Sequence, residues 1–541
     1  MFKVVSVEQM REIERAADAG GLTYATMMEN AGRSVAQHIL QRTPEIAGRR
    51  VAILVGTGNN GGDGLVVGHY LAEAGAQVAA YLLKERPADD VNLTRLQGHG
   101  ALIAVAGADQ RERVLRNLMG SADVVVDALL GTGFHLPLEG AAREMLATAG
   151  TVLASRESRP FVVAVDCPSG LDCDTGDAAP EALPADLTVT LAAAKPGLFA
   201  ASGARLIGDL ALGDIGLPEG FAQVSKAEIE VAEKSMLRAW RVPRPRDAHK
   251  GTFGRAMVIA GSVNYPGAAA LAGEAAYRVG AGLVTLAVPS LIQGMLAPQI
   301  PEATWLLLPH EMGAISEAAA AVLEPELAKC EAILLGPGFG QDPVTADFLA
   351  RLLHGSGSGK PGMGFVHPGV AAHAADTTLP PFIVDADGLK LLAGLDQWPR
   401  LLPERSVLTP HPGEMAVLTG LTTEEVQRNR LALARQMAAT WRHVVMLKGA
   451  YTVVADPNGA CAVLPFATPA LARAGTGDVL AGAIAGFVAQ GLDPWRAAVM
   501  GGFVHARAGE LAAESLEGSA SVLASDVLAG LPCALAELNA A

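Results

Sequence analysis

The sequence has few of the residues that mark several large classes of protein. Its 541 residues include only five cysteines, and aromatic residues make up 4% of the chain. Cys167 and Cys173 are too far apart for a CxxC redox pair, and no group of cysteines and histidines has the spacing of a zinc site. Cysteine redox chemistry and a zinc centre are therefore not expected.

Positive charge is also scarce. The 41 Lys and Arg residues are outnumbered by 56 Asp and Glu residues, which gives a formal net charge of −15. This balance disfavours a broad interface with nucleic acid or an anionic membrane, although a local pocket can still bind phosphate. The first residues, MFKVVSVEQMREIERAADAG, lack the apolar core of a signal peptide, and no later apolar run reaches spanning length without a charge, Gly or Pro. Small-molecule partners and a cytoplasmic location are expected.

Hydrophobic residues, by contrast, make up 50% of the chain. Strand-like runs such as RRVAILVGTG and RAMVIAGS alternate with alanine-rich helical stretches, which predicts an α/β fold with parallel sheets. The length allows two or three domains. The charged segment Ile215–Lys250 contains RVPRPR, which resists helix and buried strand. We therefore predict domains over residues 1–215 and 246–541 with a linker over 216–245, and an irregular surface loop at His354–Gly364.

Polar residues follow three predicted strands of the first half. The turn Asn59–Gly64 (NNGGDG) places bare N–H groups and a helix N-terminus where an anion such as a dinucleotide pyrophosphate can bind. Such a turn alone is equally explained by the positive φ that glycine tolerates. Asp127 and Asp166 each close a further strand, and ligands of open α/β sheets lie beyond the carboxyl ends of the strands. A single Asp after a strand is usually a turn former, whereas three such ends favour a binding site.

These motifs, together with VDALLGTG, VDCPSG and KPGLF, resemble the NAD(P)H-hydrate epimerase domain, which has a three-layer Rossmann-like fold. The resemblance covers residues 1–215. It implies that the hydrated nucleotide is bound by Asn59, Asn60, Gly61, Gly62, Asp63, Gly131, Thr132, Gly133, Phe134, His135, Leu136, Pro137 and Asp166. It also implies that Asn60, Asp127 and Ser169, which all offer hard oxygen donors, hold a potassium ion. Cys167 stands where the family is expected to have an aliphatic residue, and a buried cysteine packs as a small hydrophobe.

The implied reaction inverts C6 of a hydrated dihydropyridine through an iminium-like species. It needs an acid–base group near C6 and stabilisation of the developing cation. Asp166 is the first candidate for this catalytic role and Asp63 the second. Lys195 has two interpretations, a residue that orients phosphate or a solvated loop lysine.

A second series of motifs begins at Lys250–Gly254 (KGTFG) and runs in order along the second half. It continues with GPGFG at Gly336–Gly340, DADGL at Asp385–Leu389, TPHPGE at Thr409–Glu414, KGAYT at Lys448–Thr452 and finally AGTGD. Each is weak alone, because GPGFG can be only a turn, His411 only a satisfied loop histidine and KGAYT only a hairpin. The order of the whole series is the informative signal.

This series resembles the ribokinase-like superfamily and, within it, the ADP-dependent NAD(P)H-hydrate dehydratases, over residues 240–535. The resemblance implies a ribokinase-like α/β domain with ADP as co-substrate and Mg²⁺. The residues implied for the nucleotide are Lys448, Gly449, Ala450, Tyr451, Thr452 and Gly477, and those implied for the hydrate are Ala268, Gly338, His411 and Asp478. The whole chain is thus similar to bifunctional NAD(P)H-hydrate repair enzymes, which act on the hydrates NADHX and NADPHX, and a homo-oligomer is expected.

Asp478 is the predicted catalytic base of the second half. In a superfamily kinase the GTGD amides bind the phosphoryl group and the Asp takes the proton of the attacking hydroxyl. The same chemistry at the C6 hydroxyl creates a phosphate leaving group, so that a kinase-like half-reaction ends in dehydration. The alternative interpretation of Asp478 is a helix N-cap.

Two other functions compete with this one. A ribokinase-like small-molecule kinase with an N-terminal nucleotide-binding domain would release a stable phosphorylated product. A binding or scaffold protein would be indicated by loss of NNGGDG or GTGD, and both motifs are present.

Overall fold

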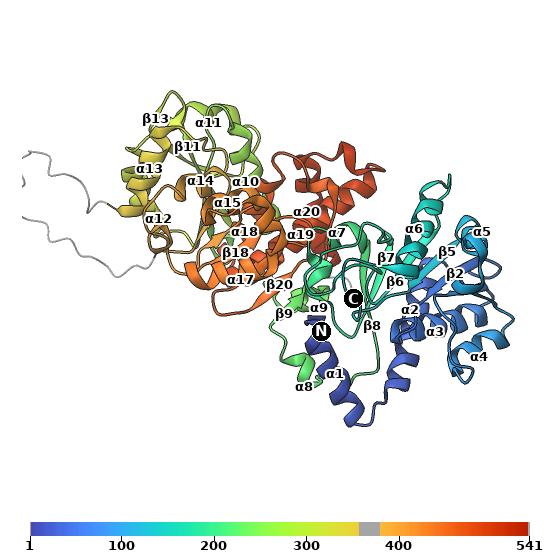
Figure 1. Ribbon diagram of the computed structural model, residues 1–541. Helices are drawn as coiled ribbons and strands as arrows, with labels where there is room; N and C mark the ends of the chain where they lie inside the picture. Colours follow the sequence, from blue (N-terminus) through green and yellow to red (C-terminus); the bar gives the residue numbers. More distant parts are fainter. Residues whose placement is uncertain (1, 356–378, 539–541) are drawn as a thin grey trace, which may run out of the picture. The chain divides into compact units, whose positions relative to one another are not determined.

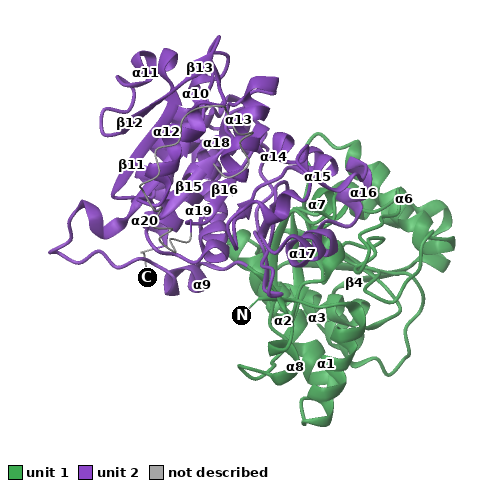
Figure 2. Ribbon diagram, turned by 90° about the vertical axis from the view of Figure 1, so that its left-hand side faces the viewer, with its two compact units in different colours: residues 1–231 green, residues 232–541 purple. Residues whose placement is uncertain are grey.

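The computed structural model describes residues 2–355 and 379–538, and these divide into two compact units, Met1–Val231 and Ala232–Ala541 (Figure 2). The division falls inside the segment predicted as a linker. That segment is folded into the short elements α8 (Ala222–Ser225), β9 (Ile229–Val231) and α9 (Lys234–Ala239). β9 pairs antiparallel with β1 (Lys3–Val4) in unit 1. Most of the surface loop predicted at His354–Gly364 lies outside the described residues.

Unit 1 contains a seven-stranded parallel sheet in the order β4-β3-β2-β5-β6-β7-β8 (Figure 1). Its strands are β2 (Arg50–Val55), β3 (Gln77–Leu82), β4 (Leu102–Val105), β5 (Val124–Ala128), β6 (Phe161–Val165), β7 (Leu187–Leu191) and β8 (Asp209–Gly213). The strand order reverses between β2 and β5. The chain leaves β2 and β5 in opposite directions, so a crevice opens at the carboxyl ends of these two strands.

Helices cover both faces of this sheet because the strands alternate their apolar side chains. Ile53 packs into a core with α2 (Tyr24–Arg42), α3 (Asn59–Glu73) and α4 (Val91–Gly98). Its neighbour Leu54 packs into the opposite core with α5 (Arg113–Ser121) and α6 (Gly140–Ala154). α1 (Val7–Ala19) buries Met10, Ile13 and Ala17 in a further core. The predicted three-layer α/β architecture is confirmed.

In unit 2 the strand order is β20-β19-β18-β17-β16-β15-β10-β11-β12. The bounds are β10 (Arg255–Ile259), β11 (Leu283–Pro289), β12 (Thr304–Leu308), β15 (Ala332–Leu335), β16 (Phe382–Val384), β17 (Val407–Leu408), β18 (Val444–Leu447), β19 (Val453–Ala455) and β20 (Cys461–Val463). Pairing is parallel from β12 to β18 and antiparallel from β18 to β20. β13 (His310–Glu311) and β14 (Ala314–Ile315) form a separate hairpin.

Small residues explain the close helix packing of unit 2. Its main core combines α10 (Pro266–Arg278), α18 (Thr476–Ala489), α19 (Pro494–Ser515) and α20 (Ala524–Glu537). A Cβ at Gly482 of α18 would lie 2.1 Å from the carbonyl oxygen of Ala272 on α10, so only glycine permits this approach. The other helices are α11 (Ser290–Leu296), α12 (Ala319–Leu327), α13 (Pro343–His354), α14 (Asp387–Leu392), α15 (Pro412–Thr419), α16 (Thr423–Arg428) and α17 (Arg430–Trp441). Within the two described stretches, no helix is long and apolar enough to cross a membrane.

Candidate active sites

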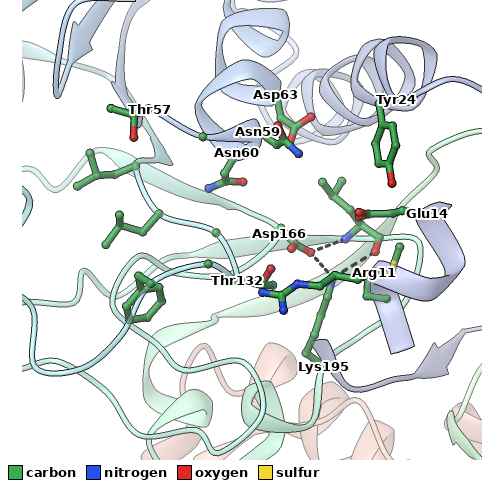
Figure 3. A pocket seen from close by; sticks show the side chains of 18 of the residues that line it. Arg11, Glu14, Tyr24, Thr57, Asn59, Asn60, Asp63, Thr132, Asp166 and Lys195 are labelled. Atoms are coloured by element: carbon green, nitrogen blue, oxygen red, sulfur yellow. Dashed lines mark hydrogen bonds and ion pairs between the residues drawn. The ribbon is translucent and has the colours of Figure 1, made fainter. Parts of the chain in front are cut away.

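A cavity of about 840 Å³ opens in unit 1 at the carboxyl ends of β2, β5 and β6 (Figure 3). The cavity is lined by Glu8, Met10, Arg11, Glu14, Arg15, Tyr24, Thr57, Gly58, Asn59, Asn60, Asp63, Leu129, Leu130, Gly131, Thr132, Gly133, Phe134, Asp166, Leu191 and Lys195. Residues that follow all three of the strands noted in the sequence analysis therefore line one cavity. No motif of the sequence indicated that α1 forms one wall of this cavity.

The predicted substrate-binding residues fall into two groups. Asn59, Asn60, Asp63, Gly131, Thr132, Gly133, Phe134 and Asp166 line the cavity. Gly61 instead packs against the end of β2, since its Cβ would lie 2.1 Å from the carbonyl oxygen of Gly56. Gly62 shares this first turn of α3, and His135, Leu136 and Pro137 continue the loop beyond the residues that line the cavity.

The N-terminus of α3 faces the same space. Its N-cap is Gly58, which has no side chain to accept a hydrogen bond from the first turn of the helix. The first-turn N–H groups of this 15-residue helix are therefore available to a bound anion, as the glycine-rich turn predicts.

Asp166 forms an ion pair with the buried Lys195, and both residues line the cavity. Oδ1 of Asp166 also accepts a hydrogen bond of 3.0 Å from the backbone N–H of Leu191, and Lys195 donates to the Leu191 carbonyl oxygen at 3.2 Å. Asp166 has a φ of 66°, a left-handed conformation that costs energy for a residue with a Cβ. Lys195 is fully buried, so the solvated-lysine interpretation is wrong.

Three further carboxyl groups line this cavity, those of Asp63 on α3 and of Glu8 and Glu14 on α1. Burial raises the pKa of Asp63 well above its usual value, and the charges of Asp166 and Glu14 raise it further. Burial also raises the pKa of Glu14, while the charge of Lys195 opposes this. The cavity thus combines an ion-paired carboxylate with two carboxyl groups whose surroundings favour the protonated form.

The three predicted potassium ligands come from neighbouring strand ends. Ser169 donates its hydroxyl and, at 2.8 Å, its backbone N–H to the buried Asp127 carboxylate. A Cβ at Gly131, in the loop after β5, would lie 3.1 Å from the Cβ of Asn60. Both polar side-chain atoms of Asn60 are buried and have no hydrogen-bond partner among the described residues. The three side chains offer an amide oxygen, a carboxylate and a hydroxyl oxygen, which are donors that suit a hard cation, and the amide oxygen is without a partner in this part of the chain.

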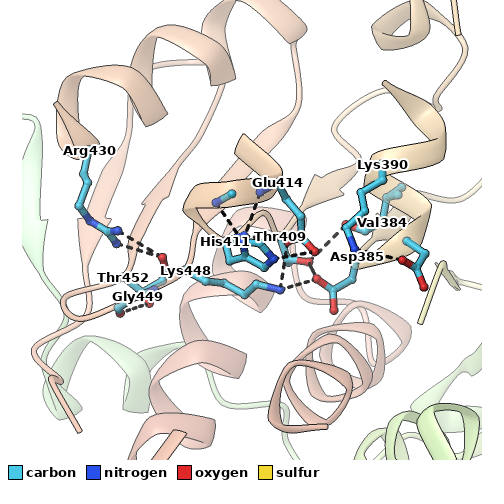
Figure 4. A network of polar contacts seen from close by, with 12 residues as sticks. Val384, Asp385, Lys390, Thr409, His411, Glu414, Arg430, Lys448, Gly449 and Thr452 are labelled. Atoms are coloured by element: carbon cyan, nitrogen blue, oxygen red, sulfur yellow. Dashed lines mark hydrogen bonds and ion pairs between the residues drawn. The ribbon is translucent and has the colours of Figure 1, made fainter. Parts of the chain in front are cut away.

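In unit 2, Lys448 lies at the centre of a polar network at the ends of β16, β17 and β18 (Figure 4). Its Nζ donates to Oδ1 of Asp385 at 2.6 Å and lies 3.8 Å from a carboxylate oxygen of Glu414. The Thr409 hydroxyl donates to the same Asp385 oxygen at 2.7 Å. Asp385, Thr409 and Glu414 belong to motifs noted in the sequence, but no role was predicted for them. Asp385 stands at the end of a buried strand, as Asp127 does, and this position in the sequence could have indicated a role for it.

The GTGD turn faces this network. α18 begins at Thr476 with Gly475, at a φ of 88°, as its N-cap. The N-cap interpretation of Asp478 is therefore wrong, because Asp478 is the third residue of the helix. Burial, and next the charge of Asp385, raise the pKa of Asp478 to about 7, with Lys448 opposing the shift. A carboxyl group with this pKa can exchange a proton near neutral pH.

The other residues predicted to contact the hydrate come from three places: Ala268 lies in α10, Gly338 follows β15 and His411 precedes α15. Gly338, at a φ of 66°, leaves no space for a side chain, since its Cβ would lie 2.8 Å from the Cβ of Ala268. His411 is half exposed and is the N-cap of α15, where its Nδ1 accepts the backbone N–H of Gly413 at 3.0 Å. This cap satisfies one ring nitrogen of His411, while Nε2 lies 3.3 Å from Glu414.

The KGAYT segment is the hairpin between β18 and β19. The Thr452 hydroxyl accepts the backbone N–H of Gly449 at 3.2 Å, Tyr451 is buried and Ala450 is exposed. The buried guanidinium of Arg430 donates to the carbonyl oxygens of Leu447 and Lys448 at 3.1 and 3.2 Å. Arg430, which the sequence reasoning missed, thus fixes the backbone from which Lys448 projects.

Comparison with known proteins gives one consistent result. The family described as NAD(P)H-hydrate dehydratase matches residues 256–532, and the family described as YjeF-related protein N-terminus matches residues 24–197. A bifunctional NAD(P)H-hydrate repair enzyme of Moorella thermoacetica is 38% identical over 547 residues, which cover 99% of this chain and 97% of that protein. The enzyme of the same name from Escherichia coli is 32% identical over 529 residues, 97% and 92% of the two chains.

Among solved structures, an ADP/ATP-dependent NAD(P)H-hydrate dehydratase of Bacillus subtilis, co-crystallised with ATP and Mg²⁺, is 30% identical. It covers 57% of this chain and 98% of its own, with a TM-score of 0.46.

Proposed function

Because this chain belongs to the family of bifunctional NAD(P)H-hydrate repair enzymes, we propose that it converts hydrated NADH and NADPH back to NADH and NADPH. The observation that carries the proposal is the match over almost the full length, with both sets of motifs in place. The resemblance inferred from the motifs is confirmed at the level of the family. The family offers no support for a small-molecule kinase or a scaffold.

Unit 1 is proposed to interconvert the R and S epimers at C6. Asp63, whose surroundings favour the protonated form, would donate a proton to the C6 hydroxyl, which then leaves as water. The ring nitrogen supplies its electron pair to C6, and the carboxylate of Asp166 would stabilise the resulting cation. Return of water to the other face, with loss of a proton, completes the inversion.

Asn60, Asp127 and Ser169 would hold a potassium ion beside this cavity. When bound, the ion would neutralise the buried charge of Asp127. The orphaned amide of Asn60 supports this assignment.

Unit 2 is proposed to dehydrate the S epimer with ADP. Asp478 would accept the proton of the C6 hydroxyl, whose oxygen then takes the β-phosphoryl group of ADP and releases AMP. The C6–O bond breaks, phosphate leaves with the bonding electrons, and loss of a proton from C5 restores the dihydronicotinamide. The pKa of Asp478 near 7 supports its role as base.

The nucleotide would be held by Lys448, the Gly449–Thr452 hairpin and Gly477, and the hydrate by Ala268, Gly338, His411 and Asp478. Mg²⁺, when bound, would neutralise phosphate charge during transfer. ADP is the expected phosphoryl donor, and assays with ADP and ATP in parallel would decide the preference. The proposal also includes a cytoplasmic location and a homo-oligomer.

The decisive experiment supplies purified protein with a mixture of R and S hydrates and excess ADP. Recovery of reduced nicotinamide is followed by its absorbance, and the remaining epimers are separated by chiral chromatography. The unmodified protein should consume the whole mixture. The Asp166→Ala variant should consume the S epimer rapidly and leave R to decline at the spontaneous epimerisation rate. Equal R and S throughout the variant's time course would refute this division of labour, and a stable phosphorylated product would instead indicate a kinase.

A further inference from the structure

The wall of the unit 1 cavity that comes from α1 carries a carboxyl group without an assigned role. Figure 3 shows Glu14 on this wall, while Asp63 projects from α3 and Asp166 lies between the two helices and the sheet. α1 is fixed in place, since Ser6 and Gln9 form a capping box and Met10, Ile13 and Ala17 are buried in a core. Glu14 therefore belongs to a rigid element of the cavity.

Inversion at C6 needs proton transfer on both faces of the ring. The leaving hydroxyl receives a proton on one face, and the incoming water loses a proton on the other. A single carboxyl group cannot reach both faces of a ring held in one orientation. The proposed function supplies Asp63 for one face and leaves the other face without a proton-transfer group.

The remaining groups of the cavity fit this role less well. Glu8 has a side chain that is 69% exposed and lies within 4.0 Å of the guanidinium groups of both Arg11 and Arg15. Asp166 is engaged by the buried ammonium of Lys195. Glu14 is the remaining carboxyl group that lines the cavity.

We propose that Glu14 is a second proton-transfer residue of the epimerase, acting on the face of the substrate ring opposite Asp63. The proposal rests on the proposed function of unit 1. In one direction Asp63 donates a proton to the hydroxyl oxygen, the C6–O bond breaks with its electrons on that oxygen, and the ring nitrogen forms a double bond to C6. Water then adds to C6 from the other face and gives its proton to the carboxylate of Glu14. In the reverse direction the two residues exchange roles, and the substrate undergoes no net oxidation or reduction.

The surroundings of the two groups agree with such an exchange. Burial, and next the charges of Asp166 and Glu14, raise the pKa of Asp63 well above its usual value. Burial also raises the pKa of Glu14, but the charges of Lys195 and Arg11 offset part of this rise. Asp63 is therefore the better proton holder of the pair and Glu14 the better acceptor.

The test compares Glu14→Gln with Glu12→Gln, a matched control at an exposed position of the same helix that does not line the cavity. Each variant receives one pure epimer in water enriched in oxygen-18, without ADP, and both epimers are analysed by chiral chromatography and mass spectrometry. In Glu14→Gln, inversion should fall by about 100-fold or more. Oxygen-18 should still enter the epimer whose hydroxyl faces Asp63, because that hydroxyl can leave and return on its own face. Glu12→Gln should behave like the unmodified protein.

Inversion within about twofold of the unmodified rate in Glu14→Gln would overturn the proposal, as would parallel loss of inversion and isotope exchange in a variant that melts normally. If Glu14→Gln melts early, Glu14→Asp replaces it. The Glu14→Asp variant should invert the substrate slowly and still incorporate oxygen-18 into the epimer whose hydroxyl faces Asp63. Equal loss of inversion and of oxygen-18 incorporation would again overturn the proposal. Failure of Asp166→Ala to affect inversion would instead count against the proposed function.

Discussion

Gly477 lies beside Lys448: a Cβ at Gly477 would be 3.6 Å from the Lys448 ammonium nitrogen and 3.7 Å from Oδ2 of Asp385. The missing side chain leaves open the space between the first turn of α18 and the partly buried ammonium of Lys448. Helix N–H groups and an ammonium ion that face one space are suited to bind a phosphate group.

Gly477→Ala should weaken ADP binding by about 10-fold or more, which is roughly 1.4 kcal/mol, because the added methyl group occupies this space. The fold should remain intact, since contacts of 3.6 Å are ordinary and Ala favours a helix over Gly. Titration calorimetry with ADP measures the effect. The control is Gly294→Ala in α11, where a Cβ meets nothing within 4 Å. Equal ADP affinity in the two variants would remove Gly477 from the nucleotide site.

Lys448→Ala should weaken ADP binding by roughly 1.5–3 kcal/mol through a lost charge-assisted hydrogen bond. It should also lower the free energy of unfolding by about 3–5 kcal/mol, since it leaves the buried Asp385 carboxylate without its partner. Adding Asp385→Asn should restore much of the stability and none of the ADP affinity. Denaturant melts and calorimetry on both variants separate the two effects. Recovery of affinity in the double variant would show that Lys448 acts only through folding.

The dehydration rate should rise with pH through an apparent pKa of about 7, as Asp478 loses its proton and becomes a competent base. Asp478→Asn should lower turnover by about 100-fold or more and abolish this rise while ADP still binds. A pH–rate profile at saturating ADP and hydrate provides the measurement. Near-normal turnover in the variant would exclude Asp478 as the base.

The same residue should reduce stability at high pH. Its folded-state pKa lies above its unfolded value of 3.8, so the folded protein binds the proton more tightly and loses stability as the pH rises from there through about 7. Asp478→Asn should therefore raise the melting temperature more at pH 8 than at pH 5. An equal gain at the two pH values would mean that the carboxyl group is not perturbed in this way.

The sequence predicted much of this arrangement because strand ends are visible in it. Asp127, Asp166 and the NNGGDG turn each follow a buried apolar run, and parallel strands bring their carboxyl ends together. The same logic applies in unit 2 to KGAYT, which directly follows β18. In unit 1 most of the residues predicted to bind the hydrate line the cavity, whereas Gly61, Gly62, His135, Leu136 and Pro137 do not.

Other parts could not be predicted from local patterns. The charged face of α1 is typical of any surface helix, and only tertiary packing turns Glu14 toward the cavity. Lys195 lies a few residues after β7. This position in the sequence is compatible both with a solvated side chain and with a buried partner of Asp166. Asp478 was compatible with an N-cap until the helix start at Thr476 was known, because helix boundaries are uncertain by one or two residues.

The buried oxygen atoms of Asn60, Asp127 and Ser169 lead to the last prediction. A cation that binds only the folded protein stabilises it by mass action, so unit 1 should melt at a higher temperature in potassium than in an equal concentration of choline chloride. Asp127→Asn should remove this difference because it removes the charge that the ion would neutralise, and it should slow epimerisation while leaving the ADP-dependent step intact, since the two units have separate cores. Asp89→Asn, at an exposed site, is the control with the same chemical change.

Melting by calorimetry does not depend on activity, so it distinguishes a lost ion from a damaged active site. A potassium effect that persists in Asp127→Asn would mean that the ion binds elsewhere, and the absence of any effect in the unmodified protein would mean that the orphaned amide of Asn60 has another partner.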